Sequence, residues 1–69
     1  MKVSARNQLP GTVKEIVRGA VTSHVRIDVG GSIVTASITN EAVEELGLTV
    51  GAPAYAIVKA TDVMVGVDA

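Results

Sequence analysis

The sequence predicts an all-β fold: a five-stranded, OB-fold-like Greek-key barrel with one short helix between the third and fourth strands. Val, Ile and Thr make up 24 of the 69 residues, and their β-branched side chains suit a pleated sheet better than a helix. One segment alternates apolar and polar side chains, and a Gly-Gly pair follows it. The element order matches an OB barrel, whose closure removes exposed sheet edges. An SH3-like barrel and an open half-sandwich completed by a partner subunit are the alternatives.

The first three strands are predicted from residue alternation and turn residues. The first strand is expected from Val3 to Val17, bent at Pro10-Gly11, where a missing N–H and a permissive glycine interrupt a ladder. Gly30-Gly31 is expected to form a hairpin turn, because both of its central positions need positive φ. The third strand then runs from Ser32 to about Ile38. In the second strand one face carries Val21, Ser23, Val25, Ile27 and Val29, and the other carries Thr22, His24, Arg26 and Asp28.

A short helix is predicted after the third strand. Thr39 supplies a hydroxyl cap, and Val43 and Leu46 are expected to face inward. Gly47 ends the helix and places Leu48 against Val43 in a Schellman stop. The chain then turns over residues 49–53, and the fourth strand is expected at about 54–59. The fifth strand, at about 63–67, follows a tight turn at 60–62.

Composition indicates a single domain over residues 1–69 with a thin aliphatic core, because Tyr55 is its only aromatic residue. So small a core favours oligomerisation. The absence of cysteine excludes disulfides and thiolate metal sites and fits a reducing compartment. No signal peptide and no apolar stretch of membrane-spanning length is visible, so a cytoplasmic protein without a membrane partner is expected.

Charge and motif content argue against two classes of function. The net charge is −1, and the six cations are scattered singly, whereas nucleic-acid binders cluster a basic excess on one face. A single-stranded nucleic-acid OB domain also stacks bases on aromatic side chains, which this chain lacks. No nucleophile elbow, phosphate loop or catalytic carboxylate pair is present, so an enzyme is not expected.

Two segments near opposite ends of the chain look like halves of an anion site. Ser4-Ala5-Arg6-Asn7-Gln8-Leu9-Pro10-Gly11 and Lys59-Ala60-Thr61-Asp62-Val63-Met64-Val65-Gly66 each place one cation among small polar groups.

These segments resemble the molbindin family of small molybdate- and tungstate-binding proteins, also called molybdenum-pterin-binding or TOBE domains. The resemblance covers the Ser-Ala-Arg-Asn-Gln-Leu opening, Ser37-Ile38-Thr39 running into Glu45-Leu46-Gly47-Leu48, and Lys59-Ala60-Thr61-Asp62-Val63-Met64. It implies a molybdate or tungstate ligand, with no cationic metal and no organic cofactor. It also implies a homo-oligomer, a hexamer built as a trimer of dimers, that stores and buffers the oxyanion in metal homeostasis. The alternative is a molybdate-responsive interaction or regulatory module acting on a separate partner protein.

The resemblance also implies a set of ligand groups shared between subunits. Ser4 and Arg6 bind the oxyanion from one subunit, while Lys59 and the backbone N–H of Ala60 complete the site from another. The strand-to-helix junction adds the Thr39 hydroxyl and the backbone N–H of Ala42. Asn7 and Gln8 are expected to serve strand and interface hydrogen bonding instead of the ligand.

Family members are also described as holding further oxyanions on a rotational symmetry axis near the turn between the first two strands. The corresponding residues here are Gly19, Ala20, Val21, Thr22, Ser23 and His24. His24 is the only histidine, and without Cys or a second His it has no partner for metal coordination. We therefore expect it to be exposed or to contact another subunit.

Overall fold

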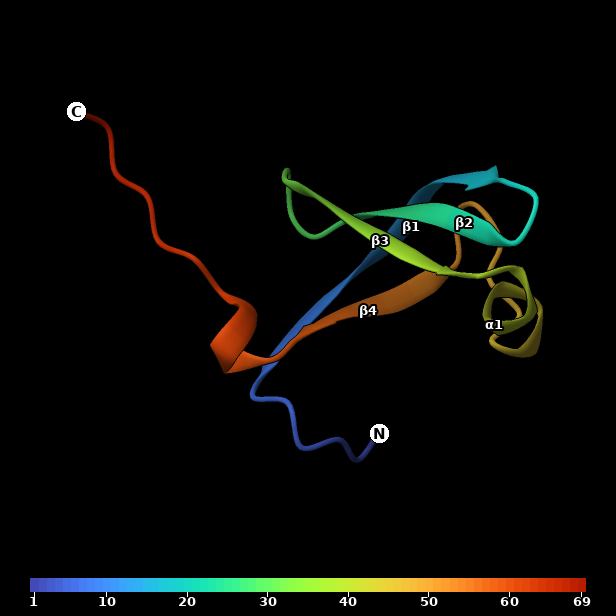
Figure 1. Cartoon of the computed structure of the whole chain (residues 1–69), viewed down its shortest axis with the longest axis horizontal. Helices are drawn as coiled ribbons and strands as arrows, with labels where there is room; N and C mark the ends of the chain where they lie inside the picture. The colour runs from blue at the N-terminus through green and yellow to red at the C-terminus, as the bar shows by residue number, and fades with distance from the viewer.

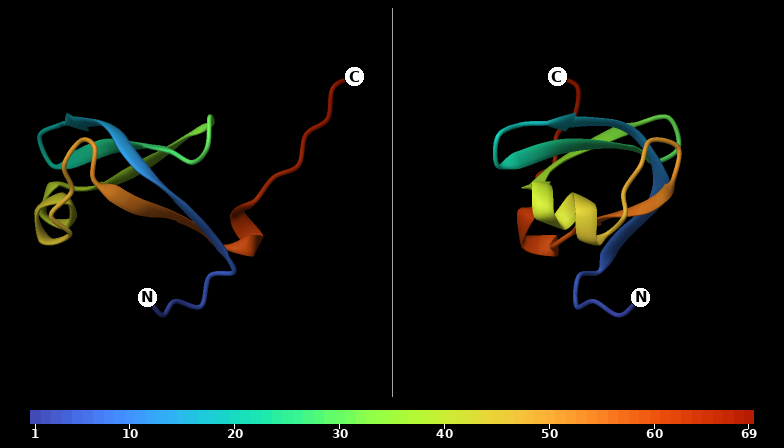
Figure 2. Two further views of the ribbon diagram at one scale, coloured as in Figure 1. Left: turned by 180° about the vertical axis from the view of Figure 1, so that it is seen from behind. Right: turned by 90° about the vertical axis from the view of Figure 1, so that its right-hand side faces the viewer.

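A computed structural model describes the whole chain, residues 1–69, as a curled four-stranded antiparallel sheet with one short α-helix (Figure 1). The strands run in the order β3-β2-β1-β4, so β3 and β4 are its two edges. Two views at right angles show that the sheet curls into a half-barrel with the α-helix at one end (Figure 2). The elements are β1 (Asn7–Arg18), β2 (Thr22–Asp28), β3 (Ile33–Thr39), α1 (Asn40–Glu45), β4 (Pro53–Val58) and the 3-10 helix η1 (Ala60–Asp62).

The long central strand β1 pairs with two neighbouring strands along successive parts of its length. Its first half pairs with β4 from Asn7 to Thr12, and its second half pairs with β2 from Thr12 to Arg18. The predicted bend at Pro10-Gly11 is wrong, because the ladder to β4 continues through both residues. Pro10 is tolerated since pairing with β2 begins only at Thr12. The irregularity lies instead between Val13 and Glu15, where the register with β2 shifts.

Gly11 is required because the backbone of β2 passes close to it, and not because β1 bends there. A Cβ at this position would collide with the backbone carbonyl of Asp28 and lie 2.9 Å from Cγ2 of Ile27. The strand also begins at Asn7, later than the predicted Val3, because residues 3–6 have no partner strand.

The predicted fifth strand is wrong in this structure, and the barrel is not closed. Residues 63–67 pair with no strand and run away from the sheet (Figure 1). A tight hairpin after β4 needs positive φ in its turn, and positive φ occurs only at Gly30, Gly31, Gly47 and Gly51. Residues 60–62 therefore form η1, which turns the chain outward.

The hairpin between β2 and β3 confirms the predicted Gly-Gly turn. Gly30 and Gly31 have φ of 95° and 98°, and the Val29 N–H donates to the Ser32 carbonyl at 2.9 Å. The carboxylate of Asp28 accepts hydrogen bonds from both glycine N–H groups, at 2.9 Å from Gly31 and 3.1 Å from Gly30. These two bonds, Gly31 first, lower the pKa of Asp28 because they stabilise its charged form.

The ends of α1 also agree with prediction, except for one side chain. Gly47 has φ of 62°, its N–H donates to Glu44, and the Leu48 N–H donates to Val43 at 3.1 Å, which is the Schellman pattern. Val43 is buried as expected. Leu46 is 68% exposed, so the prediction that it faces inward is wrong: as the C-cap residue it lies on the open side of the half-barrel.

The core is small, because only seven of the 69 residues are buried. In β2 the predicted inward face is confirmed for Ser23, Val25 and Ile27, whereas Val21 precedes the strand and is exposed. Five apolar residues form the buried cluster: Val13, Val25, Ile27, Val43 and Ala56. No helix in the structure has the length and apolar character that a membrane-spanning helix requires.

Candidate functional site

The two predicted cations lie at the same end of the sheet. Asn7 and Val58 form the last pair of the ladder between β1 and β4. Arg6 and Lys59 are the next residues beyond that pair, so the fold brings together two positions from opposite ends of the sequence. This arrangement follows directly from the antiparallel register.

Side-chain hydrogen bonds hold the opening segment in place. The Asn7 amide donates to the Val58 carbonyl at 3.2 Å, and the Gln8 amide donates to the Ala5 carbonyl at 3.1 Å. The first bond ties β1 to β4, and the second folds residues 5–8 back on themselves beside Arg6. The Asn7 contact confirms the expected strand hydrogen bonding. The Gln8 contact stays within the opening segment, and interface hydrogen bonding by either residue stays a prediction.

Positive charge at this end is unpaired. The two ion pairs of the chain join Arg18 to Glu44 at 3.0 Å and Arg26 to Glu15, and neither involves Arg6 or Lys59. The hydrogen bonds that close η1 are donated by residues 62 and 63, so the turn does not use the Ala60 N–H. Ser4, Arg6, Lys59 and Ala60 are all exposed. This end therefore offers a hydroxyl, two cations and an amide to an external anion.

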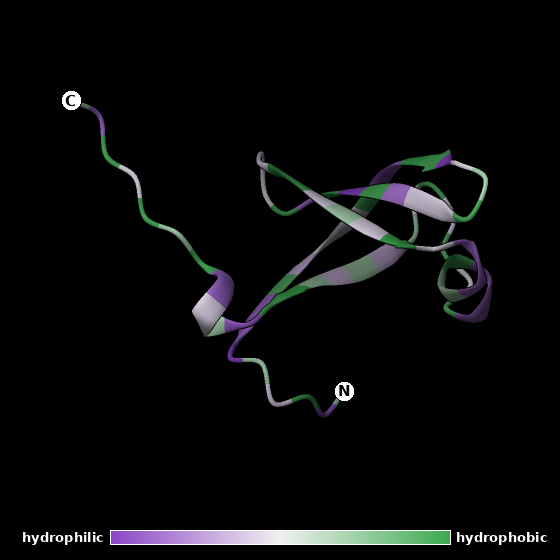
Figure 3. Ribbon diagram, in the orientation of Figure 1, coloured by the Kyte–Doolittle hydropathy of each residue, from purple (hydrophilic) through white to green (hydrophobic).

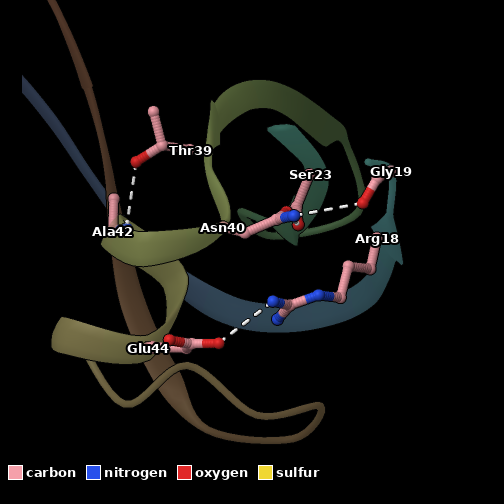
Figure 4. A network of polar contacts seen from close by, with 7 residues as sticks. All are labelled: Arg18, Gly19, Ser23, Thr39, Asn40, Ala42 and Glu44. Atoms are coloured by element: carbon pink, nitrogen blue, oxygen red, sulfur yellow. Dashed lines mark hydrogen bonds and ion pairs between the residues drawn. The ribbon is translucent and has the colours of Figure 1, made fainter. Parts of the chain in front are cut away.

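The second predicted group lies at the start of α1. Thr39 caps the helix, and its hydroxyl oxygen accepts the Ala42 N–H at 3.0 Å (Figure 4). The Ala42 N–H is thus already engaged within the chain, while the Thr39 hydroxyl hydrogen is still available to donate.

A buried polar network beneath this helix start was missed by sequence reasoning. The Ser23 hydroxyl donates to the Asn40 side-chain oxygen at 2.5 Å, and the Asn40 amide donates to the Gly19 carbonyl at 3.1 Å (Figure 4). Ser23 is 1% exposed and Asn40 is 8% exposed. A signal for it existed, since a serine on the apolar face of β2 needs a buried partner. The network fixes the residue that follows Thr39.

The two groups are far apart within one chain. β1 has 12 residues, which span about 40 Å along the strand at roughly 3.3 Å per residue. Arg6 precedes its first residue, while Thr39 pairs with Thr22, just beyond its last. The curl of the sheet shortens the direct separation, yet η1 and α1 still lie at opposite ends of the sheet (Figure 1). A single tetrahedral anion cannot contact both groups of one chain.

The turn between β1 and β2 lies beside the Thr39 group. Gly19 donates its N–H to the Thr22 carbonyl at 2.8 Å, and Thr22 and His24 are exposed, as expected for the histidine. The Ser23 hydroxyl is buried in the network and faces no open surface. An open cavity of about 410 Å³ adjoins the turn and is lined by Arg18, Ala20, Val21, Thr39, Asn40 and Glu41. No three His, Cys, Asp or Glu residues are grouped as cation ligands.

Comparisons with known proteins match nearly the whole chain. The family model described as TOBE domain matches residues 3–65. A probable molybdenum-pterin-binding protein of Haemophilus influenzae is 54% identical over 69 residues, covering 99% of this chain and all of the relative. The molybdenum transport protein ModE of Herbaspirillum seropedicae is 52% identical over 67 residues, which cover 96% of this chain and 25% of that protein.

One solved structure is similar in both sequence and fold. It is the cytoplasmic molybdate-binding protein ModG in a crystal form with molybdate bound. The likeness has a TM-score of 0.91 with 49% sequence identity, and it covers 99% of this chain and 49% of ModG.

Proposed function

This chain belongs to the TOBE domain family and is a molbindin, and on that basis we propose that it binds molybdate reversibly, and tungstate likewise. The proposed role is storage and buffering of the oxyanion in the cytoplasm, without catalysis and without an organic cofactor. The observation that carries the proposal is the 49% identity, over 99% of this chain, to a protein crystallised with molybdate.

The proposed ligand groups match the chemistry of a tetrahedral dianion, which needs hydrogen-bond donors and positive charge without inward acceptors. Arg6 and Lys59 supply charge with no carboxylate to compete. The Ser4 hydroxyl and the Ala60 N–H add neutral donors at the same end. Charge-assisted hydrogen bonds contribute about 1.5–3 kcal/mol each, and a micromolar Kd needs about 8.2 kcal/mol. Five or six such bonds are therefore sufficient.

The site is completed between subunits. The resemblance implied Arg6 and Lys59 from different copies, whereas the β1–β4 register places them at adjoining positions of one chain. Because the Arg6 and Thr39 groups lie at opposite ends of the sheet, we propose that Arg6 and Lys59 come from one copy and Thr39 from another. A two-fold dimer would form two equivalent sites of this kind, since each copy contributes both groups. We extend the proposal to a hexamer, built as a trimer of such dimers.

We expect the start of α1 to bind the oxyanion mainly through the Thr39 hydroxyl. The Ala42 N–H is bonded to Thr39 Oγ1 at 3.0 Å, so it would be shared between that cap and the ligand. Capping orients the threonine hydroxyl, and its hydrogen can point to the anion while its oxygen still accepts from Ala42.

A second oxyanion position is proposed on a symmetry axis near residues 19–24. Its donors would be the exposed Thr22 and His24, because the Ser23 hydroxyl already donates to Asn40. Arg18 lines the adjoining cavity and would add positive charge, although Glu44 offsets part of it.

Equilibrium dialysis with elemental analysis tests the proposal. The chain should retain molybdenum at micromolar free molybdate, and sulfate at the same concentration should not displace it. Absence of bound molybdenum, or equal uptake of sulfate, would contradict molybdate binding.

A regulatory module is the second candidate, because the matched part of ModE is only a quarter of a longer protein. Such a role would require a separate partner whose binding depends on the ligand. A pull-down with and without molybdate separates the two: ligand-dependent capture of one partner favours regulation, whereas none favours storage.

A further inference from the structure

The side-chain amide of Asn7 joins the two strand ends that carry the proposed cations. It donates to the Val58 carbonyl at 3.2 Å, across a separation of 51 positions in the sequence. Asn7 directly follows Arg6, and Val58 directly precedes Lys59. Hydropathy colouring shows hydrophilic residues where β1 begins and β4 ends (Figure 3). One hydrogen bond therefore links the neighbours of both cations.

The end of the β1–β4 ladder needs such a link because of the charges beyond it. Arg6 and Lys59 are the next residues past the Asn7–Val58 pair. Residues at opposing positions of an antiparallel pair have Cβ atoms about 4.5–5.5 Å apart, and like charges placed there repel each other. No carboxylate offsets this repulsion, since neither cation makes an ion pair. The repulsion acts to separate the two strand ends, and the Asn7–Val58 bond opposes it.

The main chain on the other side of Arg6 is held as well. The Gln8 amide donates to the Ala5 carbonyl at 3.1 Å. Lys59 has an extended backbone, with φ of −64° and ψ of 141°, so β4 keeps its direction up to the turn of η1. Hydrogen bonds of neighbouring residues thus hold the backbone near both cations, while the charged groups themselves make no ion pair.

A similar arrangement occurs in the other half of the proposed site. Asn40 directly follows Thr39, and its side-chain amide donates to the Gly19 carbonyl at 3.1 Å. The two asparagines differ in their surroundings, because Asn40 is 8% exposed, whereas Asn7 is only half-buried and lies at the end of a ladder. Loss of the Asn7 amide should therefore cost less stability than loss of the Asn40 amide.

We propose that Asn7 is a positioning residue of the oxyanion site, which sets the spacing between Arg6 and Lys59 before the ligand binds. It acts through the two cations and not by contact with the oxyanion, since its amide already donates to the Val58 carbonyl. Two cations held at a fixed spacing lose less conformational freedom on binding, so a tetrahedral dianion binds more tightly. The inference rests on the proposed function and names a residue that organises its site.

Equilibrium dialysis of Asn7→Ala against molybdate tests the positioning role. The variant should bind about three- to tenfold more weakly, which is the net contribution of one hydrogen bond, and light scattering should show an unchanged oligomeric state. Thr12→Ala is the matched control and should bind normally, since Thr12 is exposed at the other end of the same ladder. In an Arg6→Ala background, Asn7→Ala should weaken binding by less than about twofold, because a single cation leaves no spacing to set.

Disulfide formation measures the spacing without any ligand. The native chain has no cysteine, so Arg6→Cys and Lys59→Cys are combined in one chain, and the rate of disulfide closure is followed in a redox buffer. Adding Asn7→Ala should slow closure about threefold or more, because the strand ends then spend less time at bonding distance. Adding Thr12→Ala should leave the rate unchanged.

The positioning role is overturned if Asn7→Ala binds molybdate as tightly as the unmodified chain, or if it leaves the rate of disulfide closure unchanged. An undiminished loss of affinity in the Arg6→Ala background would show that Asn7 contacts the ligand itself, and a changed oligomeric state would assign Asn7 to the subunit interface. Failure of the proposed function is distinguishable. If the unmodified chain binds no molybdate while Asn7→Ala still slows closure, the function is contradicted and the role of Asn7 in spacing the strand ends is supported.

Discussion

The two ends of the sheet differ in whether their polar and charged side chains find partners within the same chain. At the α1 end, Ser23, Asn40 and Gly19 are joined by hydrogen bonds, and Arg18 is paired with Glu44. At the η1 end, Arg6 and Lys59 have no carboxylate partner, and the apolar residues 63–67 are exposed. One end is complete within a chain, whereas the other presents charge and apolar surface that a second chain and an anion can use.

Because of this difference, we expect residues at one end of the sheet to affect mainly stability and residues at the other end to affect mainly ligand binding and assembly. Changes at the α1 end should act first on folding, because they leave buried groups unpaired. Changes at the η1 end should act first on assembly and ligand binding, because Arg6 and Lys59 make no ion pair in their own chain.

Asn40→Leu should destabilise the chain by about 2–4 kcal/mol, because it leaves the buried Ser23 hydroxyl and the Gly19 carbonyl without partners. Urea unfolding measures the loss. Adding Ser23→Ala should recover part of it, since one of the two unpaired groups is then removed. Ser37→Ala, on the exposed side of β3, should change stability little. A loss as small as that control would show that the network is not a stabilising element.

Arg6→Ala and Lys59→Ala should each weaken molybdate binding at least tenfold, about 1.4 kcal/mol or more, and leave circular dichroism and urea unfolding unchanged. Each removes a cation that makes no ion pair in its own chain. Lys14→Ala is the control for net charge, because Lys14 is an exposed cation within β1. Unchanged affinity in both variants, measured by dialysis or calorimetry, would show that neither Arg6 nor Lys59 binds the ligand.

Asp28→Asn should give the smallest effect, a pH-dependent loss of stability confined to the β2–β3 turn. The glycine N–H groups lower the folded-state pKa of Asp28, so this contribution is fully present above the unfolded-state value of about 3.9. It is lost as pH falls through the lower folded-state pKa. The difference in urea midpoint between the two chains should therefore shrink in acid. A constant difference down to low pH would contradict the assignment.

Local features were predictable because their causes lie in neighbouring residues. The Gly30-Gly31 turn, the Thr39 cap and the Gly47 stop each depend on a backbone conformation or a hydroxyl within a few positions. The buried face of β2 followed from its period-two alternation.

The remaining features depend on contacts that sequence spacing does not reveal. From the sequence alone Gly11 was interpreted as interrupting the strand, but it is needed because the Asp28 carbonyl leaves no room for a Cβ atom. Residues 63–67 have the composition of a strand, but the connection after β4 keeps them from their own sheet. The proximity of Arg6 to Lys59 needed the register of β1 with β4.

Complementation between two impaired chains tests whether two copies together complete the molybdate site. Arg6→Ala and Thr39→Val chains are mixed in equal amounts, unfolded, refolded together and dialysed at a molybdate concentration that fills only intact sites. About one quarter of the sites should regain full affinity, because random pairing brings intact Arg6 and intact Thr39 together from different chains that often. Affinity no better than in either variant alone would contradict it.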